Sequence, residues 1–149
     1  MTAARVGVVL GGGTPRQEEV IGDFFLALGI AFQLVDDAIN LRGYEHALKA
    51  HAEDLVEGKL TAPVVRAFMA LEGEGQRRLW ELMDAPRQQR DIPAILELVE
   101  GCGAVDWCHR RAGTIVEEAW DDVDDLLPES HAKMALRAFS WFVVDVRDY

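Results

Sequence analysis

Hydrophobic residues recur at helical spacing along most of the chain. The longest such stretch covers residues 18–41, where apolar side chains stand three or four positions apart: Val20, Ile21, Phe24, Phe25, Leu28, Phe32, Val35 and Ile39. Thr14 and Pro15 precede it as a cap and first-turn pair, and Gly43 follows it as a stop. The spacing therefore predicts one long helix over residues 18–41.

The same period continues to the C-terminus. It predicts further helices over five ranges: 63–71, 76–83, 91–101, 105–127 and 130–147. Only "RVGVVLGGG" has a strand-like composition, and a helix ending in a glycine turn is favoured there. The glycines of "LGGGTP" lack the spacing and the lysine of a phosphate-binding loop. We therefore expect an all-α fold, a helical bundle of about six helices in one domain over residues 1–149.

Charge and composition exclude several function classes. The 149 residues carry 15 basic and 26 acidic side chains, a net charge of −11. Nucleic acid and anionic lipid are poor partners for such a chain, and an anionic ligand would need a metal ion or local cations. No apolar run approaches the roughly 20 residues of a membrane span, so we expect a cytoplasmic protein. Cys102 and Cys108 lack the further ligands of a zinc site and are interpreted as two unpaired thiols.

One polar stripe interrupts the long helix. In "GIAFQLVDDAINLRG", the residues Gln33, Asp36, Asp37 and Asn40 stand at i, i+3, i+4 and i+7, which places them on one helical face. A helix this apolar is normally interior, where adjacent carboxylates repel each other and are costly to desolvate. A divalent cation removes both costs, and Mg²⁺ suits such oxygen ligands. The alternative, an ordinary amphipathic helix with the stripe facing solvent, stays open on the helix alone.

The segment after this helix favours the metal interpretation. "LKAHAEDLVEGKLTAP" brings Lys49, Asp54 and Lys59 just beyond the helix end. Cations beside a metal-binding face are what a diphosphate leaving group requires. They would also explain how an acidic protein holds an anion.

Here the sequence resembles a known family. "LGIAFQLVDDAINLRG" followed by "EDLVEGKLTAPVV" is similar to the second aspartate-rich region of the trans-type polyprenyl diphosphate synthases. "TAARVGVVLGGG" is similar to the family's preceding helix, and the segment from "VEEAWDDVDD" through "LPES" to the C-terminus is similar to its last helix pair. The resemblance covers essentially the whole chain and implies the C-terminal half of the isoprenoid synthase fold.

The resemblance implies a reaction and residue roles. Family members join an allylic diphosphate to isopentenyl diphosphate, and Mg²⁺ bridges the allylic diphosphate to two facing aspartate-rich motifs. By position, Asp36 would be the chief magnesium ligand, with Asp37 in support and Asn40 in the third ligand position. The substrate-binding side chains would be Phe32, Gln33, Lys49, Asp54 and Lys59. No residue of this chain is assigned a catalytic role.

The chain departs from the family pattern in ways that bear on activity. Asn40 replaces the third aspartate of the motif, and Leu48 and Ala52 replace two usual glycines. The family's first aspartate-rich motif and its isopentenyl diphosphate pocket lie in an N-terminal half that this sequence does not match. The resemblance therefore implies that the chain is inactive alone. It would need the missing N-terminal half of a longer protein, a separate chain supplying that half, or a second copy in a homo-oligomer.

Two further interpretations compete with this one. The first is a non-catalytic helical interaction or regulatory subunit derived from a polyprenyl synthase, which Asn40 and the lost glycines favour. The second is a relative of the terpene cyclases, which is disfavoured because their N-D-x-x-S-x-x-x-E pattern is missing.

The run "DDVDD" at 121–125 also fits a D-D-x-x-D motif. A solvated helix face is favoured for that run, because it lies just before the "LPES" break.

Overall fold

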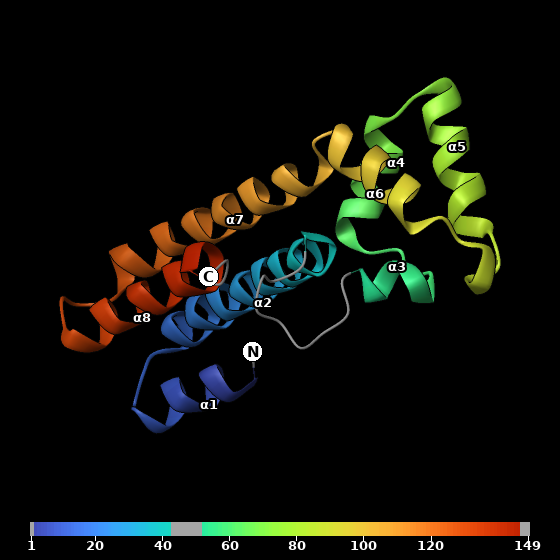
Figure 1. Ribbon diagram of the computed structural model, residues 1–149. Helices are drawn as coiled ribbons and strands as arrows, with labels where there is room; N and C mark the ends of the chain where they lie inside the picture. Colours follow the sequence, from blue (N-terminus) through green and yellow to red (C-terminus); the bar gives the residue numbers. More distant parts are fainter. Residues whose placement is uncertain (1, 43–51, 147–149) are drawn as a thin grey trace. The chain divides into compact units, whose positions relative to one another are not determined.

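The computed structural model describes residues 2–42 and 52–146, and every regular element within them is helical (Figure 1). The α-helices are α1 Thr2–Leu10, α2 Pro15–Arg42, α3 Glu53–Glu57, α4 Ala62–Ala70, α5 Gly73–Asp84, α6 Ile92–Gly101, α7 Ala104–Leu126 and α8 His131–Trp141. A 3-10 turn at Arg87–Gln89 precedes α6, and a π-helical turn at Phe142–Val146 follows α8. The all-α prediction is confirmed for these residues.

Several helices begin where capping residues predict. Asp91 caps α6, because its side chain accepts a hydrogen bond from the backbone N–H of Ala94 at 3.1 Å. Ser130 caps α8 in the same way, with the backbone N–H of Lys133 at 3.1 Å. Each cap satisfies a backbone donor that the first helical turn leaves without a partner. The helix starts predicted at residues 91 and 130 are therefore confirmed.

The structure differs from the predicted helix count at both ends of α2. Residues 2–10 form helix α1, and Gly12 follows with φ 74°, so the glycine-turn interpretation of "LGGGTP" is confirmed. Helix α3 lies inside the segment expected as a loop; five residues are too few to show a helical period. The described residues thus contain eight α-helices where about six were expected.

The first of two compact units contains residues 2–33 and 111–146. Its core joins α2 to α7, where the ring of Phe24 meets that of Trp120 edge-on at 5.6 Å between centroids. Helix α8 adds Arg137, whose guanidinium lies 5.0 Å from the Trp120 ring centroid and 4.6 Å from that of Trp141. Helix α1 belongs to this unit but buries none of its residues.

The second compact unit contains residues 34–42 and 52–110. Helices α4, α5 and α6 pack on one another and on the C-terminal end of α2. The largest fully buried side chains of this unit share an aliphatic character: Val35, Leu41, Leu55, Pro63, Val64, Leu79, Ile95, Val99 and Val105. The polar stripe of α2 therefore lies on a helix that is packed into a hydrophobic core.

Helix α2 corrects the expectation that no apolar stretch approaches the length of a membrane span. By length and composition it is the one described helix that could cross a membrane, with a mean hydropathy of 1.5 over its best window. Within the protein, 44% of that window is buried, and core helices pass the same test. The finding is weak evidence for a span.

Candidate functional site

The polar stripe of α2 occupies more than one environment. Gln33 and Asp36 are exposed, Asn40 is half-buried, and Asp37 retains only 9% of its exposure. Consecutive helical residues are about 100° apart, so Asp36 and Asp37 mark the two edges of the stripe. One edge faces solvent and the other faces protein. The interpretation of the whole stripe as interior is therefore wrong for Gln33 and Asp36.

Asp37 holds the start of α4 against α2. Its Oδ2 accepts a hydrogen bond from the backbone N–H of Ala62, the first residue of α4, at 2.8 Å. Thr61 is the N-cap residue of α4, yet its own side chain makes no capping bond. A carboxylate at a helix N-terminus is stabilised by the helix dipole as well as by the hydrogen bond. Asp37 therefore caps α4 from a different helix.

Cys108 of α7 contributes to the electrostatic surroundings of Asp37. The Cys108 side chain is fully buried, and burial raises the pKa of its thiol to about 11. The Asp37 carboxylate adds to this increase in pKa, while Arg66 opposes it. The thiol therefore stays protonated and uncharged at neutral pH. Asp37 thus lies near an uncharged sulfur.

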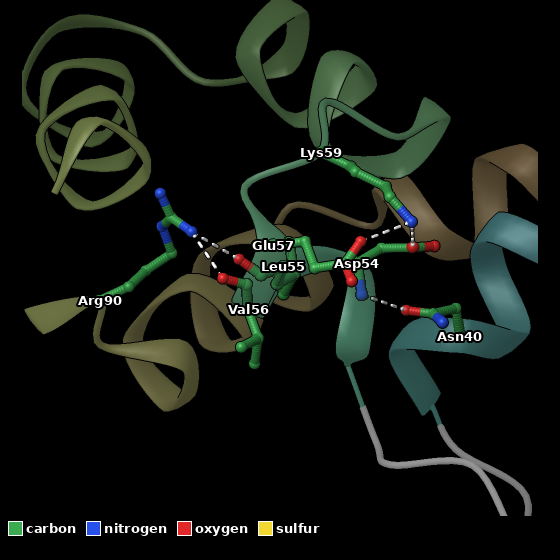
Figure 2. A network of polar contacts seen from close by, with 7 residues as sticks. All are labelled: Asn40, Asp54, Leu55, Val56, Glu57, Lys59 and Arg90. Atoms are coloured by element: carbon green, nitrogen blue, oxygen red, sulfur yellow. Dashed lines mark hydrogen bonds and ion pairs between the residues drawn. The ribbon is translucent and has the colours of Figure 1, made fainter. Parts of the chain in front are cut away.

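Asn40 makes the corresponding contacts to α3. Its side-chain Oδ1 accepts a hydrogen bond from the backbone N–H of Asp54 at 3.3 Å (Figure 2). Its backbone oxygen accepts a second one from the N–H of Ala52 at 3.0 Å. An amide oxygen serves as such an acceptor without bringing a charge. The residue that replaces the third aspartate of the motif therefore has a structural role in this chain.

The predicted substrate-binding residues Asp54 and Lys59 form an ion cluster. Lys59 Nζ lies 2.7 Å from Asp54 Oδ1 and 2.8 Å from Glu57 Oε2 (Figure 2). The hydrogen bonds to Asp54 and Glu57 raise the pKa of the Lys59 ammonium well above its ordinary value. The cluster carries two negative charges against one positive charge. A diphosphate would have to compete with these carboxylates for Lys59.

The other predicted substrate-binding residues are less closely described. Phe32 lies on α2 and is 42% exposed. Gln33 follows it and is also exposed. Lys49 lies outside the described residues. The structure thus brings together Asn40, Asp54 and Lys59.

Arg90 is a member of this region that the sequence did not indicate. It stands between α5 and α6, and its guanidinium donates hydrogen bonds to four backbone carbonyl oxygens. Two belong to α3 and two to the end of α5. The sequence around it, "RQQRDIP", has no pattern that separates Arg90 from its neighbour Arg87. Only the proximity of the two helix ends in the fold distinguishes them.

The residues present fit one mode of magnesium binding. Within the described ranges, no three His, Cys, Asp or Glu side chains come close enough to hold a metal by themselves. Mg²⁺ is, however, commonly bound by one or two carboxylates, with waters and substrate phosphates completing its ligands. Asp36 and Asp37 are adjacent carboxylates of this kind, although one Asp37 oxygen already accepts from Ala62. The stripe therefore suits a metal that arrives with a phosphate ligand.

The second aspartate run, "DDVDD", lies on an exposed face of α7. All four of its aspartates are exposed, and Val123 between them is buried. The carboxylate of Asp124 pairs with Lys133 Nζ at 3.0 Å, and the backbone oxygen of Asp124 accepts from the same ammonium at 2.8 Å. The interpretation as a solvated helix face is confirmed.

Comparison with known proteins adds family evidence to this geometry. The family model described as polyprenyl synthetase matches residues 1–99. That range contains all the predicted site residues and Arg90.

Curated relatives match along nearly the whole chain. Octaprenyl diphosphate synthase of Haemophilus influenzae is 31% identical over 148 residues, which cover 99% of this chain and 44% of the relative. All-trans-nonaprenyl-diphosphate synthase (geranyl-diphosphate specific) of Rhodobacter capsulatus is 33% identical over 134 residues, 89% of this chain and 41% of the relative. The chain therefore spans less than half the length of these curated relatives.

Solved structures share the arrangement of helices. Polyprenyl synthetase from Streptomyces coelicolor A3(2) matches with a TM-score of 0.83 and 27% identity, covering 95% of this chain and 44% of that one. Geranylgeranyl pyrophosphate synthase from Corynebacterium glutamicum matches with a TM-score of 0.79 and 26% identity over the same shares, 95% and 44%. The latter structure is a complex with calcium and isoprenyl diphosphate. The expected resemblance to the isoprenoid synthase fold is confirmed.

Proposed function

Because this chain belongs to the polyprenyl synthetase family, we propose that it binds an allylic diphosphate with magnesium at the Asp36 end of α2. It would do so as a trans-prenyltransferase-type protein of isoprenoid biosynthesis in the cytoplasm. The observation that carries the proposal is the family match over residues 1–99, because this range includes the aspartate pair and the Lys59 segment. The calcium and isoprenyl diphosphate held by the Corynebacterium glutamicum relative support the same ligand chemistry.

Each predicted site residue of the chain would have a separate role in binding the metal and the diphosphate. Asp36 presents an exposed carboxylate for the metal, and Asp37 keeps α4 in place while lying beside it. A bound magnesium ion would supply positive charge to a departing diphosphate. Lys49 and Lys59 would supply further positive charge, with Lys59 exchanging a carboxylate contact for a phosphate contact. Phe32 would form part of an apolar wall that excludes water from the allylic group.

Condensation with isopentenyl diphosphate would need further family residues, supplied by the rest of a longer chain or by a partner. The chain covers only 44% of a relative such as octaprenyl diphosphate synthase. Helix α1 supports a partner surface, because it is apolar and buries none of its residues, with Val6, Val9 and Leu10 all largely exposed. An apolar helix of this kind is normally covered. The partner would be a chain supplying the remaining family residues, or a second copy.

The second candidate function is a non-catalytic interaction subunit. Three contacts favour it: Asn40 is a neutral acceptor for α3, Asp37 caps α4, and Lys59 is paired with two carboxylates. In this case the polar residues of α2 would serve the fold alone. The two candidates differ in whether the chain binds a diphosphate when magnesium is present.

Calorimetric titration with a non-hydrolysable allylic thiodiphosphate tests the proposal. Binding is expected with magnesium and not without it, and Asp36→Ala should abolish it. Asp23→Ala is the matched control, because Asp23 is an exposed aspartate on the same helix and pairs with Arg5 at 3.5 Å. Binding that survives in Asp36→Ala contradicts the role proposed for Asp36. Absence of binding in the unmodified chain contradicts the proposal as a whole and favours the interaction subunit.

A further inference from the structure

We propose that Arg90 is a positioning residue for the Lys59 segment: it clamps the C-terminal end of α3 while Asn40 holds the N-terminal end. The inference deepens the proposed function, because its consequence for ligand binding rests on a diphosphate site at α2. Its structural part can be tested without any ligand.

Helix α3 cannot be positioned by its own stability. It contains five residues, far fewer than the roughly 12–15 that an isolated helix needs. Its N-cap residue, Ala52, is in the left-handed region with φ 57° and offers no side-chain cap. Instead, Asn40 of α2 accepts from the backbone of both Ala52 and Asp54. The N-terminal end of α3 is therefore held by α2.

The guanidinium of Arg90 holds the other end. Nη1 donates to the backbone oxygens of Leu55 and Val56 at 3.1 and 2.9 Å, two of the carbonyls at the C-terminal end of α3 (Figure 2). Nη2 donates to the backbone oxygens of Met83 and Ala85 at 3.1 and 2.9 Å, at the end of α5. A cation at two helix C-termini also interacts favourably with both helix dipoles. One planar side chain thus joins α3 to α5.

Gly58 makes room for this clamp. It follows α3 with φ 80°, and a Cβ there would stand 2.9 Å from Arg90 Nη2 and 3.0 Å from Nη1. A side chain at this position would therefore be strained by the backbone conformation and would also displace the guanidinium. Lys59 comes next in the chain, and its backbone N–H donates to the oxygen of Asp54 at 2.9 Å. The clamp therefore ends one residue before Lys59.

The position of Lys59 is fixed by its ion pairs with α3 and, through α3, by the contact with α2. Its ammonium contacts Asp54 and Glu57, which are both residues of α3. Asp54 is in turn bonded through its backbone to Asn40 on the polar stripe. Loss of Arg90 should release the C-terminal end of α3, and Lys59 would lose its fixed location relative to α2. The charge of Lys59 would remain, but its position would not.

Amide hydrogen exchange tests the clamp directly in the full chain. Arg90→Lys keeps the charge, but its single nitrogen cannot reproduce a four-bond fork. The amides of Val56, Gly58 and Lys59 should then exchange about tenfold faster, as expected when hydrogen bonds to a charged donor are lost. The amide of the fully buried Val99 should be unaffected. Arg87→Lys is the matched control, because Arg87 is an exposed arginine three residues away.

A second variant reaches the clamp from the opposite side. Gly58→Ala should accelerate the same amides, and its effect should be non-additive with Arg90→Lys because both remove one interaction. It also carries the test if Arg90→Lys does not fold. Exchange within about twofold of the unmodified chain in both variants would overturn the inference.

Ligand affinity separates positioning from simple support of the fold. With inorganic diphosphate and magnesium as the probe, Arg90→Lys should weaken binding about tenfold, and Arg87→Lys should not change it. Faster exchange with unchanged affinity would show that Arg90 supports the fold only, and would overturn the positioning role. If the unmodified chain does not bind the probe, the proposed function fails, while the exchange experiment still decides whether Arg90 clamps α3.

Discussion

The cap that Asp37 provides to α4 makes a sharp prediction for stability. In Asp37→Ala, the backbone N–H of Ala62 loses its partner, a carboxylate oxygen at 2.8 Å, in a region where Asp37 is only 9% exposed. An unsatisfied buried donor costs about 1–3 kcal/mol, and loss of a helix cap about 1 kcal/mol; both figures describe the same hydrogen bond and are not added. We expect the free energy of unfolding to fall by about 2 kcal/mol.

Two comparison variants separate the hydrogen bond from the charge. Asp37→Asn keeps an acceptor oxygen and loses only the interaction of the charge with the helix dipole, at a cost of about 0.5 kcal/mol. Asp36→Ala alters the adjacent, exposed aspartate and should change stability by less than about 0.5 kcal/mol.

Urea denaturation followed by circular dichroism measures all three changes. Asp37→Ala should lower the free energy of unfolding clearly more than either of the other two variants. Because a domain is stable by about 5–15 kcal/mol, a loss of about 2 kcal/mol is easily resolved. Equal destabilisation by Asp37→Ala and Asp36→Ala would refute the assignment of Asp37 as the cap of α4.

Three other predictions follow from single residues. Ala52→Val should destabilise the chain by about 2 kcal/mol in urea denaturation, because φ 57° disfavours a β-branched residue; Ala52→Gly should be nearly neutral, since relief of about 1 kcal/mol offsets the lost methyl contact. In Cys102→Ser, the remaining thiol of Cys108, with its pKa raised to about 11, should react with an aromatic disulfide about 100-fold more slowly than a free thiol at pH 8. Glu129 and Asp124 raise the pKa of Lys133, so its stabilisation should be complete below the ordinary lysine pKa of about 10.4 and be lost as pH rises through the folded-state pKa. The stability difference between the unmodified chain and Lys133→Met, measured from pH 7 to pH 12, should therefore shrink only at the alkaline end.

The long helices were predictable because each of them carries its own signal. In α2 the apolar spacing and the flanking Pro15 act within the helix, and the structure confirms a helix from Pro15 to Arg42. The caps Asp91 and Ser130 likewise act on residues three positions away. Interactions between residues only a few positions apart can be recognised from the local sequence.

The contacts around the site were not predictable, because their partners are distant in sequence. Asp37 caps a helix that begins 25 residues later, and Arg90 bonds to α3 across 34 and 35 residues. The local sequence pattern carries no information about pairs of residues that are this far apart in the chain. Helix α3 was missed for the same reason, since its five residues are held by Asn40 and Arg90 from elsewhere in the chain.

The division between Asp36 and Asp37 bears on how a ligand could be held. Adjacent helical residues point about 100° apart, so a chain that uses Asp37 to cap α4 turns only the Asp36 edge of the stripe to solvent. Asn40 adds no charge to that edge, and its Oδ1 already accepts from Asp54. Under the proposed function, most ligands of a magnesium ion would then be phosphate and water oxygens. Recognition would accordingly depend on the diphosphate and the metal together, which makes the position of Lys59, and hence of α3, decisive for affinity.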